Sequence, residues 1–168
     1  MNSIVIYTSH FGNTRAIAEA IAKGLRSRGM ARVLSVEDVG AALPERADLV
    51  VIGGPTEAHG MTPPLIEWLG RLEPDALRGL AAVGFDTRLR WPRWLSGSAG
   101  SGITEKLHQT GAQVIAPAES FFIKGAVGTG GSKTATLQDG ELERAVAWGA
   151  SLADKLEPVA PAAPGSLR

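Results

Sequence analysis

Hydroxyl, amide and glycine residues gather between Thr8 and Thr14, where the sequence reads Thr-Ser-His-Phe-Gly-Asn-Thr. A short apolar, β-branched run precedes them at residues 3–7, and residues 15–25 place apolar side chains at helical spacing. This pattern predicts a buried strand, a loop and a helix, in that order. The first N–H groups of a helix have no partner within it, and the helix dipole favours an anion there.

Four residues of this loop have the chemistry of an anion cradle. Ser9 and Thr14 supply hydroxyl donors, and Asn13 supplies an amide. Gly12 lets the backbone approach a ligand closely or adopt a positive φ. Because Ser, Thr and Asn are also ordinary residues before a helix, the loop alone fits either a phosphate cradle or a capped helix without ligand.

The histidines and the glycine-rich segment offer weaker signals. His10, His59 and His108 lack the spacing of metal ligands. We expect His108 on a helix surface and the other two in loops, where a ligand contact and a plain polar position both stay open. Residues 125–134 are rich in glycine, but Ser132 interrupts the contiguous Gly-Lys-Thr that a P-loop requires, so a flexible loop is predicted.

Composition bounds the class of protein. The chain has 168 residues, enough for one domain, and 17 basic and 17 acidic side chains, so a broad basic face for nucleic acid is not expected. The absence of cysteine excludes disulfides, thiolate metal sites and cysteine nucleophiles. Without an apolar run of about 18 residues or a leader pattern, we expect no membrane span and a cytoplasmic protein.

Strands and helices alternate along the chain, which predicts an α/β protein with a doubly wound parallel sheet. We expect a single domain over residues 1–156 and a disordered Pro/Ala-rich tail over 157–168. The predicted strands are residues 3–7, 31–36, 48–54, 79–85 and 113–123, the last broken near Pro117, and the predicted helices are residues 13–28, from 63, 102–110 and 141–156. Five strands fit the order 2-1-3-4-5, with helices on both faces.

In this order a ligand binds at the carboxyl ends of the strands, where the strand order reverses. Three predicted loops converge there, at residues 8–14, 54–62 and 86–100. The third contains Trp91 and Trp94, either of which could stack on a flat ring or simply pack the loop against the body. It also carries Arg88, Arg90 and Arg93, which fit a solvated face or contact with an anionic ligand or partner.

Two of these loops resemble the flavodoxin family. Residues 8–14 look like the phosphate loop that ends in Gly-Asn-Thr, and residues 51–56, Val-Ile-Gly-Gly-Pro-Thr, resemble the end of the third strand and its following loop. The resemblance implies a flavodoxin-like fold and an FMN cofactor. The implied cofactor-binding residues are Ser9, His10, Phe11, Gly12, Asn13 and Thr14 at the phosphate, Pro55, Thr56 and Glu57 along one side of the ring, Phe85, Asp86, Thr87 and Arg88 at its pyrimidine edge, and Trp91 as a candidate stacking residue.

The chain departs from the family at three points. Phe11 replaces a usual hydroxyl residue, and the second loop has Glu57 and His59 without a Trp or Tyr. The third loop lacks the usual Gly-Asp followed by Tyr, and the chain is neutral where flavodoxins are acidic. Because arginines near the ring would stabilise the anionic, fully reduced flavin, we expect a second reduction step less negative than in acidic flavodoxins.

Three functions follow from the resemblance. The first is a one-electron carrier that holds FMN between redox partner proteins, which would dock on the loop of Arg88, Arg90 and Arg93. The second is an FMN-dependent NAD(P)H:quinone-type reductase. The third is a flavodoxin-fold binding module without flavin. No catalytic side chain and no metal site are expected, and the oligomeric state and the identity of the partners are left open.

Overall fold

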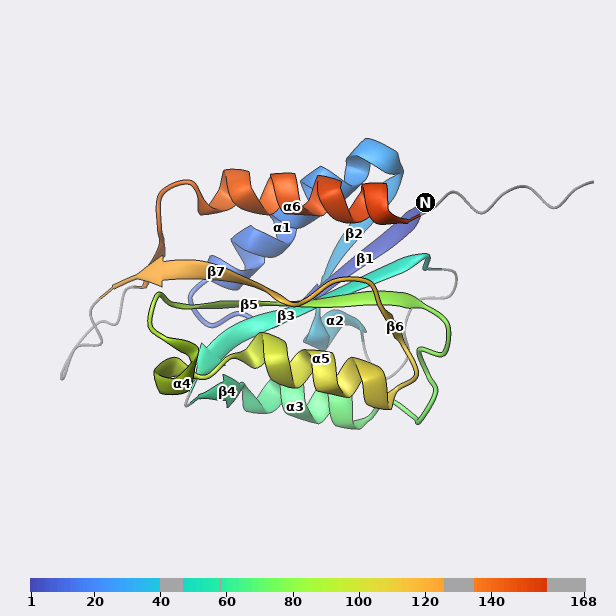
Figure 1. The fold of residues 1–168 in the computed structure, drawn as a ribbon, viewed down its shortest axis with the longest axis horizontal. Helices are drawn as coiled ribbons and strands as arrows, with labels where there is room; N and C mark the ends of the chain where they lie inside the picture. The colour runs from blue at the N-terminus through green and yellow to red at the C-terminus, as the bar shows by residue number, and fades with distance from the viewer. Residues whose placement is uncertain (40–46, 58, 126–134, 157–168) are drawn as a thin grey trace, which may run out of the picture.

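The computed structural model describes residues 1–39, 47–57, 59–125 and 135–156 (Figure 1). The strands are β1 (Asn2–Tyr7), β2 (Met30–Ser35), β3 (Leu49–Glu57), β4 (Gly60–Met61), β5 (Ala81–Leu89), β6 (Gln113–Val114), β7 (Glu119–Lys124) and β8 (Thr136–Leu137). The helices are α1 (Asn13–Leu25), continued by a 3-10 turn at Arg26–Arg28, α2 (Val36–Val39), α3 (Pro63–Gly70), α4 (Arg93–Ser96), α5 (Ala99–Gln109) and α6 (Glu141–Lys155).

The central strands run in the order β2-β1-β3-β5-β7, and they pair in parallel. This confirms the predicted doubly wound sheet, with β5 as the fourth strand and β6 and β7 as the interrupted fifth. The sheet has more than five strands because β4 and β8 add short antiparallel partners to β3 and β7. The strand order reverses between β1 and β3, as expected.

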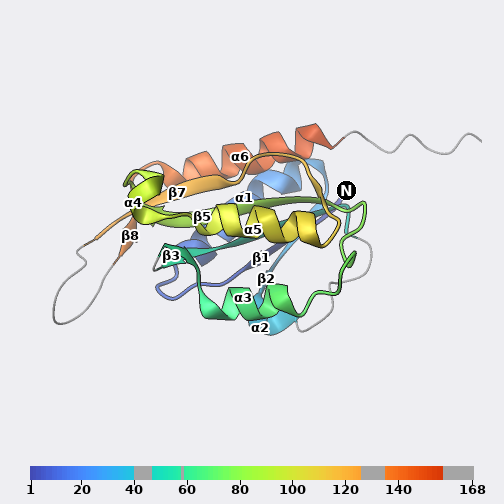
Figure 2. The same ribbon diagram turned by 60° about the horizontal axis from the view of Figure 1, so that its bottom comes forward.

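Helices cover both faces of the sheet. Figure 1 shows α1 and α6 on one face and α3 and α5 on the other, and Figure 2 shows the same layers after a turn of the molecule. Alternate residues of one strand enter opposite cores: Val51 packs with α1 and α6, whereas Val50 and Ile52 pack with α3 and α5. An apolar run that looks continuous in sequence is therefore shared between two cores.

Two predicted loops contain more strand than expected. In the predicted loop at residues 54–62, β3 continues to Glu57 and returns as β4. In the predicted loop at residues 86–100, β5 continues to Leu89, and α4 and the start of α5 follow. The reason is that the polar side chains of Asp86, Thr87 and Arg88 find hydrogen-bond partners inside the protein, so the strand stays buried although its sequence turns polar.

Smaller differences concern the ends of two elements. The first helix ends at Leu25, before the predicted end at residue 28, and Val36 begins α2, whereas the sequence predicted it as the last residue of the second strand. Apart from Gly125, the predicted glycine-rich loop at 125–134 lies outside the described residues, as does the predicted tail at 157–168. Within the described part of the chain, no helix has the length and apolar character needed to cross a membrane.

Candidate functional site

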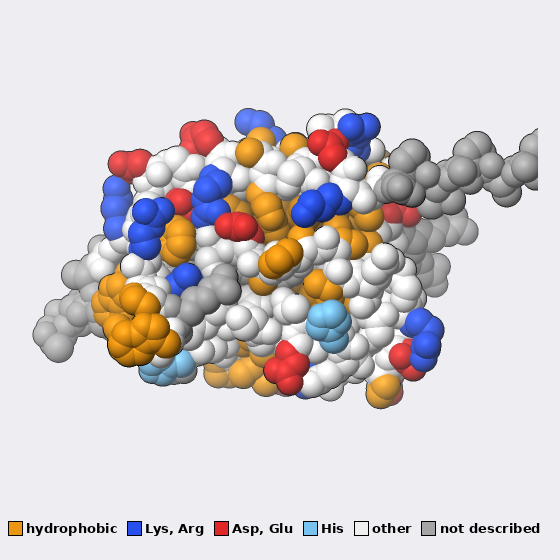
Figure 3. Space-filling model, in the orientation of Figure 1, with side chains coloured by type: hydrophobic (Ala, Val, Ile, Leu, Met, Phe, Trp, Pro, Cys, Tyr) orange, Lys and Arg blue, Asp and Glu red, His pale blue; other side chains and the backbone are white. Residues whose placement is uncertain are grey.

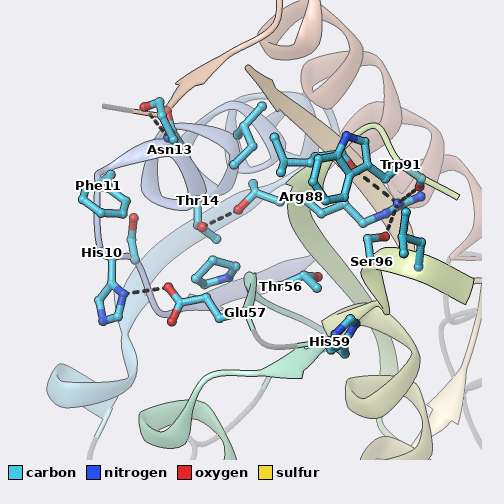
Figure 4. Close-up of a pocket in the computed structure, with 17 residues that line it drawn as sticks. His10, Phe11, Asn13, Thr14, Thr56, Glu57, His59, Arg88, Trp91 and Ser96 are labelled. Carbon is cyan, nitrogen blue, oxygen red and sulfur yellow. Dashed lines mark hydrogen bonds and ion pairs between the residues drawn. The ribbon is translucent and has the colours of Figure 1, made fainter. Parts of the chain in front are cut away.

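A cavity of about 300 Å³ lies at the carboxyl ends of β1, β3 and β5, where the strand order reverses (Figure 4). Segments far apart in the sequence form its walls: the β1–α1 loop, the β3–β4 hairpin, the end of β5 with α4, and β7. The lining residues are Ser9, His10, Phe11, Asn13, Thr14, Pro55, Thr56, Glu57, His59, Thr87, Arg88, Leu89, Trp91, Leu95, Ser96, Ile123 and Ala135.

The β1–α1 loop presents the start of α1 to this cavity. Gly12 occupies the N-cap position with φ +81°, a conformation that glycine adopts without strain, and the space where its Cβ would lie is open. Among the described residues, no side chain caps this helix end, so its first N–H groups have no side-chain acceptor. Ser9 Oγ is buried there and has no hydrogen-bond partner among the described residues. Such a group is costly to leave unsatisfied, which indicates a missing acceptor.

Thr14 and Asn13 hold the loop in place. Thr14 Oγ1 lies 2.7 Å from Thr87 Oγ1, so the loop is bonded to β5. Only one of the two hydroxyl hydrogens is used in that contact, and the other stays available to a ligand. Asn13 Nδ2 donates to the carbonyl oxygen of Ala135 at 2.8 Å, which ties the loop to the segment before β8.

His10 and Glu57 join the first wall of the cavity to the second. His10 Nδ1 lies 2.7 Å from Glu57 Oε1, and both side chains are partly exposed at the cavity mouth (Figure 4). In the first turn of α1, Arg15 pairs with Glu19, which lies one turn further along the helix. The hydrogen bond that Arg15 Nε donates to the Glu19 carboxylate is the largest cause that raises the pKa of Arg15, and coulombic interactions with Tyr7 and Glu19 raise it further.

Asp86 lies beneath the cavity and connects the β3–β4 segment to the end of β5 and the start of α5. Its Oδ2 accepts hydrogen bonds from Thr56 Oγ1 at 3.0 Å, Ser98 Oγ at 2.6 Å and the N–H of Gly100 at 3.0 Å. Thr56 Oγ1 also accepts the N–H of Ala99 at 2.9 Å. The buried carboxylate therefore fixes the β3 end against the start of α5, although it does not itself line the cavity.

Arg88 organises the third wall. The side chain is buried, and its Nε donates to Ser120 Oγ on β7 at 3.1 Å. Its Nη1 donates to the carbonyl oxygen of Trp91 at 2.8 Å and to Ser96 Oγ at 3.1 Å. Nε also lies 3.9 Å from Asp86 Oδ1, which gives the two buried charges a mutual attraction. Of the two alternatives for the arginines, a solvated face does not hold for Arg88, whose buried charge lies in the cavity wall beneath the turn.

The two tryptophans of this turn have different environments. Trp91 lines the cavity and is 51% exposed, whereas Trp94 is 85% exposed and does not line it. Of the two alternatives left open by the sequence, packing of the segment against the body does not hold for Trp94, and Trp91 is the tryptophan that lies at the cavity. Phe11 is 58% exposed on the opposite side of the mouth. This position, where the family usually has a hydroxyl residue, therefore presents an aromatic ring and a backbone N–H to the cavity.

The structure brings most of the predicted site residues together. Those that line the cavity are Ser9, His10, Phe11, Asn13, Thr14, Pro55, Thr56, Glu57, Thr87, Arg88 and Trp91. Gly12 caps α1 beside them, whereas Phe85 lies in the core against Gly53 and Asp86 lies beneath the wall.

His59, for which a ligand contact was left open, also lines the cavity, and sequence reasoning missed five lining residues, Leu89, Leu95, Ser96, Ile123 and Ala135. Strand periodicity could have found Leu89 once β5 was known to continue, because Leu89 lies two residues after Thr87 and so shares its strand face. The position of Ala135 depends on Asn13, and no local signal predicts it.

The comparisons with known proteins agree with this geometry. The family model described as Flavodoxin matches residues 5–148. The chain belongs to the flavodoxin family. This confirms the resemblance seen in the phosphate loop, and membership implies a flavin cofactor, typically FMN.

Solved flavodoxins share the fold. A flavodoxin from the domain Archaea has 24% identity and a TM-score of 0.71, with 92% of this chain and 98% of that chain covered. Flavodoxin 1 from Bacillus cereus has 22% identity and a TM-score of 0.74, with 94% and 100% covered. A flavodoxin described as WrbA-like, from Agrobacterium tumefaciens, has 21% identity and a TM-score of 0.68, with 91% and 95% covered. No curated protein matches the chain in sequence.

The residues present fit a flavin phosphate. An uncapped helix start, an open space at Gly12 and the unpartnered Ser9 hydroxyl form a set of donors without an acceptor. The rest of the cavity is mostly apolar, through Pro55, Leu89, Trp91, Leu95 and Ile123, as a flat aromatic ligand requires.

Proposed function

We propose that the protein binds FMN in this cavity and carries single electrons between redox partner proteins. The observation that carries the proposal is the buried, unpartnered hydroxyl of Ser9 beside the uncapped start of α1. A buried donor set of this kind stabilises a phosphate and would otherwise remain unsatisfied. Family membership supports the choice of a flavin as the molecule that bears the phosphate.

The residues divide into two groups in this proposal. Ser9, Thr14 and the first N–H groups of α1 hold the phosphate, and Gly12 keeps side-chain atoms out of its way. Trp91, Pro55 and the apolar wall hold the ring and exclude water from one side of it. FMN, when bound, supplies the one-electron chemistry, while the protein supplies binding, orientation and the local charge.

Two devices fix the geometry of the ring wall. The contact between His10 and Glu57 holds the first and second segments at a constant separation across the mouth. The buried charges of Asp86 and Arg88 hold the second and third segments. A preformed cavity keeps the cost of ordering low when the cofactor binds.

Flavin fluorescence tests the proposal. Titration of the purified protein into FMN should quench the flavin emission with a stoichiometry of one, and the protein should turn yellow. A colourless protein that takes up no added FMN would refute the carrier and reductase functions together, and would support the binding module.

The reductase remains a second candidate because of one observation. The β3–β4 segment contributes Pro55, Glu57 and His59 to the cavity and no Trp, Tyr or Phe, so one wall lacks a large aromatic ring. A second planar molecule would find less obstruction on that side than beside Trp91. Oxidation of NADPH by the FMN-loaded protein, with and without a soluble quinone, separates the two functions. A turnover well above that of free FMN would replace the carrier proposal with the reductase.

A further inference from the structure

Three large apolar side chains beside the cavity are exposed, and we call them the tryptophan patch: Trp91, Trp94 and Leu95. Their exposed fractions are 51%, 85% and 45%. Figure 3 shows a block of hydrophobic side chains at the end of the molecule where α4 lies in Figure 1, with Lys and Arg side chains beside it. A side chain as large as Trp94 held in water indicates a surface that another molecule covers.

The backbone that carries the patch is tightly held. Arg88 bonds the carbonyl oxygen of Trp91 and the hydroxyl of Ser96, one at each end of the turn. The N–H groups of Leu95 and Ser96 both donate to the carbonyl oxygen of Pro92, at 2.9 and 3.0 Å. Gly97 forms a parallel bridge with His59, and a Cβ at Gly97 would collide with the His59 backbone. A partner that binds the patch therefore meets a preorganised surface and pays little to order it.

An unpaired positive charge adjoins the patch. Arg90 precedes Trp91 and is exposed, with its guanidinium 4.6 Å from the centre of the Phe122 ring. Within the described residues no carboxylate pairs with it. Two cations on neighbouring elements are paired, since Lys124 pairs with Asp139, and Arg144 bonds Glu119 and Glu141.

The segment around Arg90 has few acidic side chains. Residues 87–104 contain no Asp or Glu, and of their three arginines Arg88 is buried beside Asp86. Trp and Arg are the residues that most often dominate the free energy of protein–protein binding. Exposed Trp94 beside unpaired Arg90 is therefore complementary to a partner that offers an apolar pocket with carboxylates beside it.

We propose that the tryptophan patch and Arg90 form the docking surface for an acidic redox protein. This inference rests on the proposed function, because Trp91 and Leu95 also line the cavity and a partner seated on the patch borders the flavin site. Partner docking was expected on the loop of Arg88, Arg90 and Arg93. Because Arg88 is buried and positions the turn, Arg90 and Trp94 would be the residues of that loop that meet the partner.

The test uses rubredoxin, a small acidic one-electron acceptor, and the variants Trp94→Ser and Arg90→Gln. Stopped-flow oxidation of the reduced, FMN-loaded protein by rubredoxin should slow about tenfold for Trp94→Ser. Arg90→Gln should slow it about threefold at low ionic strength, and that difference should vanish near about 0.5 M NaCl. The matched controls Ile66→Ser and Arg78→Gln change an exposed apolar residue and an exposed arginine elsewhere, and should stay within about twofold of the unmodified protein.

Calorimetry of rubredoxin binding to the FMN-free protein separates this proposal from the proposed function. A failure to take up FMN refutes the electron-carrier function, yet weaker rubredoxin binding by both variants would still support the docking surface. Rates and affinities that neither variant changes would overturn the docking surface. It would also be overturned if basic cytochrome c were the faster acceptor and Trp94→Ser left that rate unchanged. Loss of sedimentation with anionic phosphatidylglycerol vesicles in Trp94→Ser, with rubredoxin unaffected, would assign the patch to a membrane and overturn the proposal.

Discussion

Replacement of Ser9 by alanine tests the phosphate cradle at the level of one hydroxyl. In the structure Ser9 Oγ is buried without a partner among the described residues, beside the open start of α1. A hydrogen bond to a charged group contributes about 1.5–3 kcal/mol. Since about 1.4 kcal/mol is a tenfold change in Kd, Ser9→Ala should weaken FMN binding by about 12- to 140-fold.

The same substitution should not lower the free energy of unfolding of the FMN-free protein. Removing a buried hydroxyl that has no partner relieves a desolvation cost of about 1–3 kcal/mol, so the free energy of unfolding should stay unchanged or rise. Ser3→Ala is the matched control, because Ser3 Oγ is also buried without a partner among the described residues but lies on β1 away from the cavity. Ser3→Ala should behave similarly in urea denaturation and leave FMN binding unchanged.

Fluorescence-quenching titrations with FMN and with riboflavin give the required readout. Riboflavin lacks the phosphate, so Ser9→Ala should leave its Kd unchanged while the Kd for FMN rises. The reasoning is refuted if both ligands weaken equally, because the effect would then come from a general distortion of the loop. It is also refuted if the Kd for FMN does not change.

Three further predictions concern the backbone, the buried charges and the potential. Gly12→Ala and Gly140→Ala should each lower the free energy of unfolding by about 1 kcal/mol in urea denaturation, since both glycines are helix N-caps with φ near +80° and open space at the Cβ. Only Gly12→Ala should weaken FMN binding. Equal effects of the two substitutions on FMN binding would contradict the phosphate cradle. Arg88→Met should lower the free energy of unfolding by about 3 kcal/mol, because it leaves the buried Asp86 carboxylate without its counter-charge, and a change below about 1 kcal/mol would contradict that pairing. In redox titrations of the FMN-loaded protein, the potential of the second reduction step should be less negative than in acidic flavodoxins. Arg88→Met should make that potential more negative by on the order of 50 mV. A potential in the unmodified protein as low as in acidic flavodoxins would refute the electrostatic reasoning.

The order of the strands and the location of the cavity could be predicted from the sequence because both follow from local patterns. Apolar runs such as Leu49–Ile52 mark the buried strands, and the alternation with helices fixes a parallel sheet. The phosphate loop lies next to the first strand in sequence, so its contacts with α1 are local. The switch-point rule then places the two other segments beside it.

The ends of β3 and β5 could not be predicted, because long-range hydrogen bonds decide them. Thr56 and Asp86 are 30 residues apart in the sequence, yet their side chains bond each other and keep polar residues in buried strands. The burial of Arg88 could not be decided from the sequence for the same reason, since its partner Ser120 lies 32 residues away. The exposure of Trp94 follows from the turn that Arg88 holds, and no residue next to Trp94 indicates it.

A crystal structure of the protein with FMN would test the central claim most directly. The account predicts the phosphate within hydrogen-bond distance of Ser9 Oγ and the first N–H groups of α1, with the ring against Trp91 and Pro55. A flavin bound elsewhere, or a phosphate that points into solvent while Ser9 Oγ stays unpartnered, would contradict it.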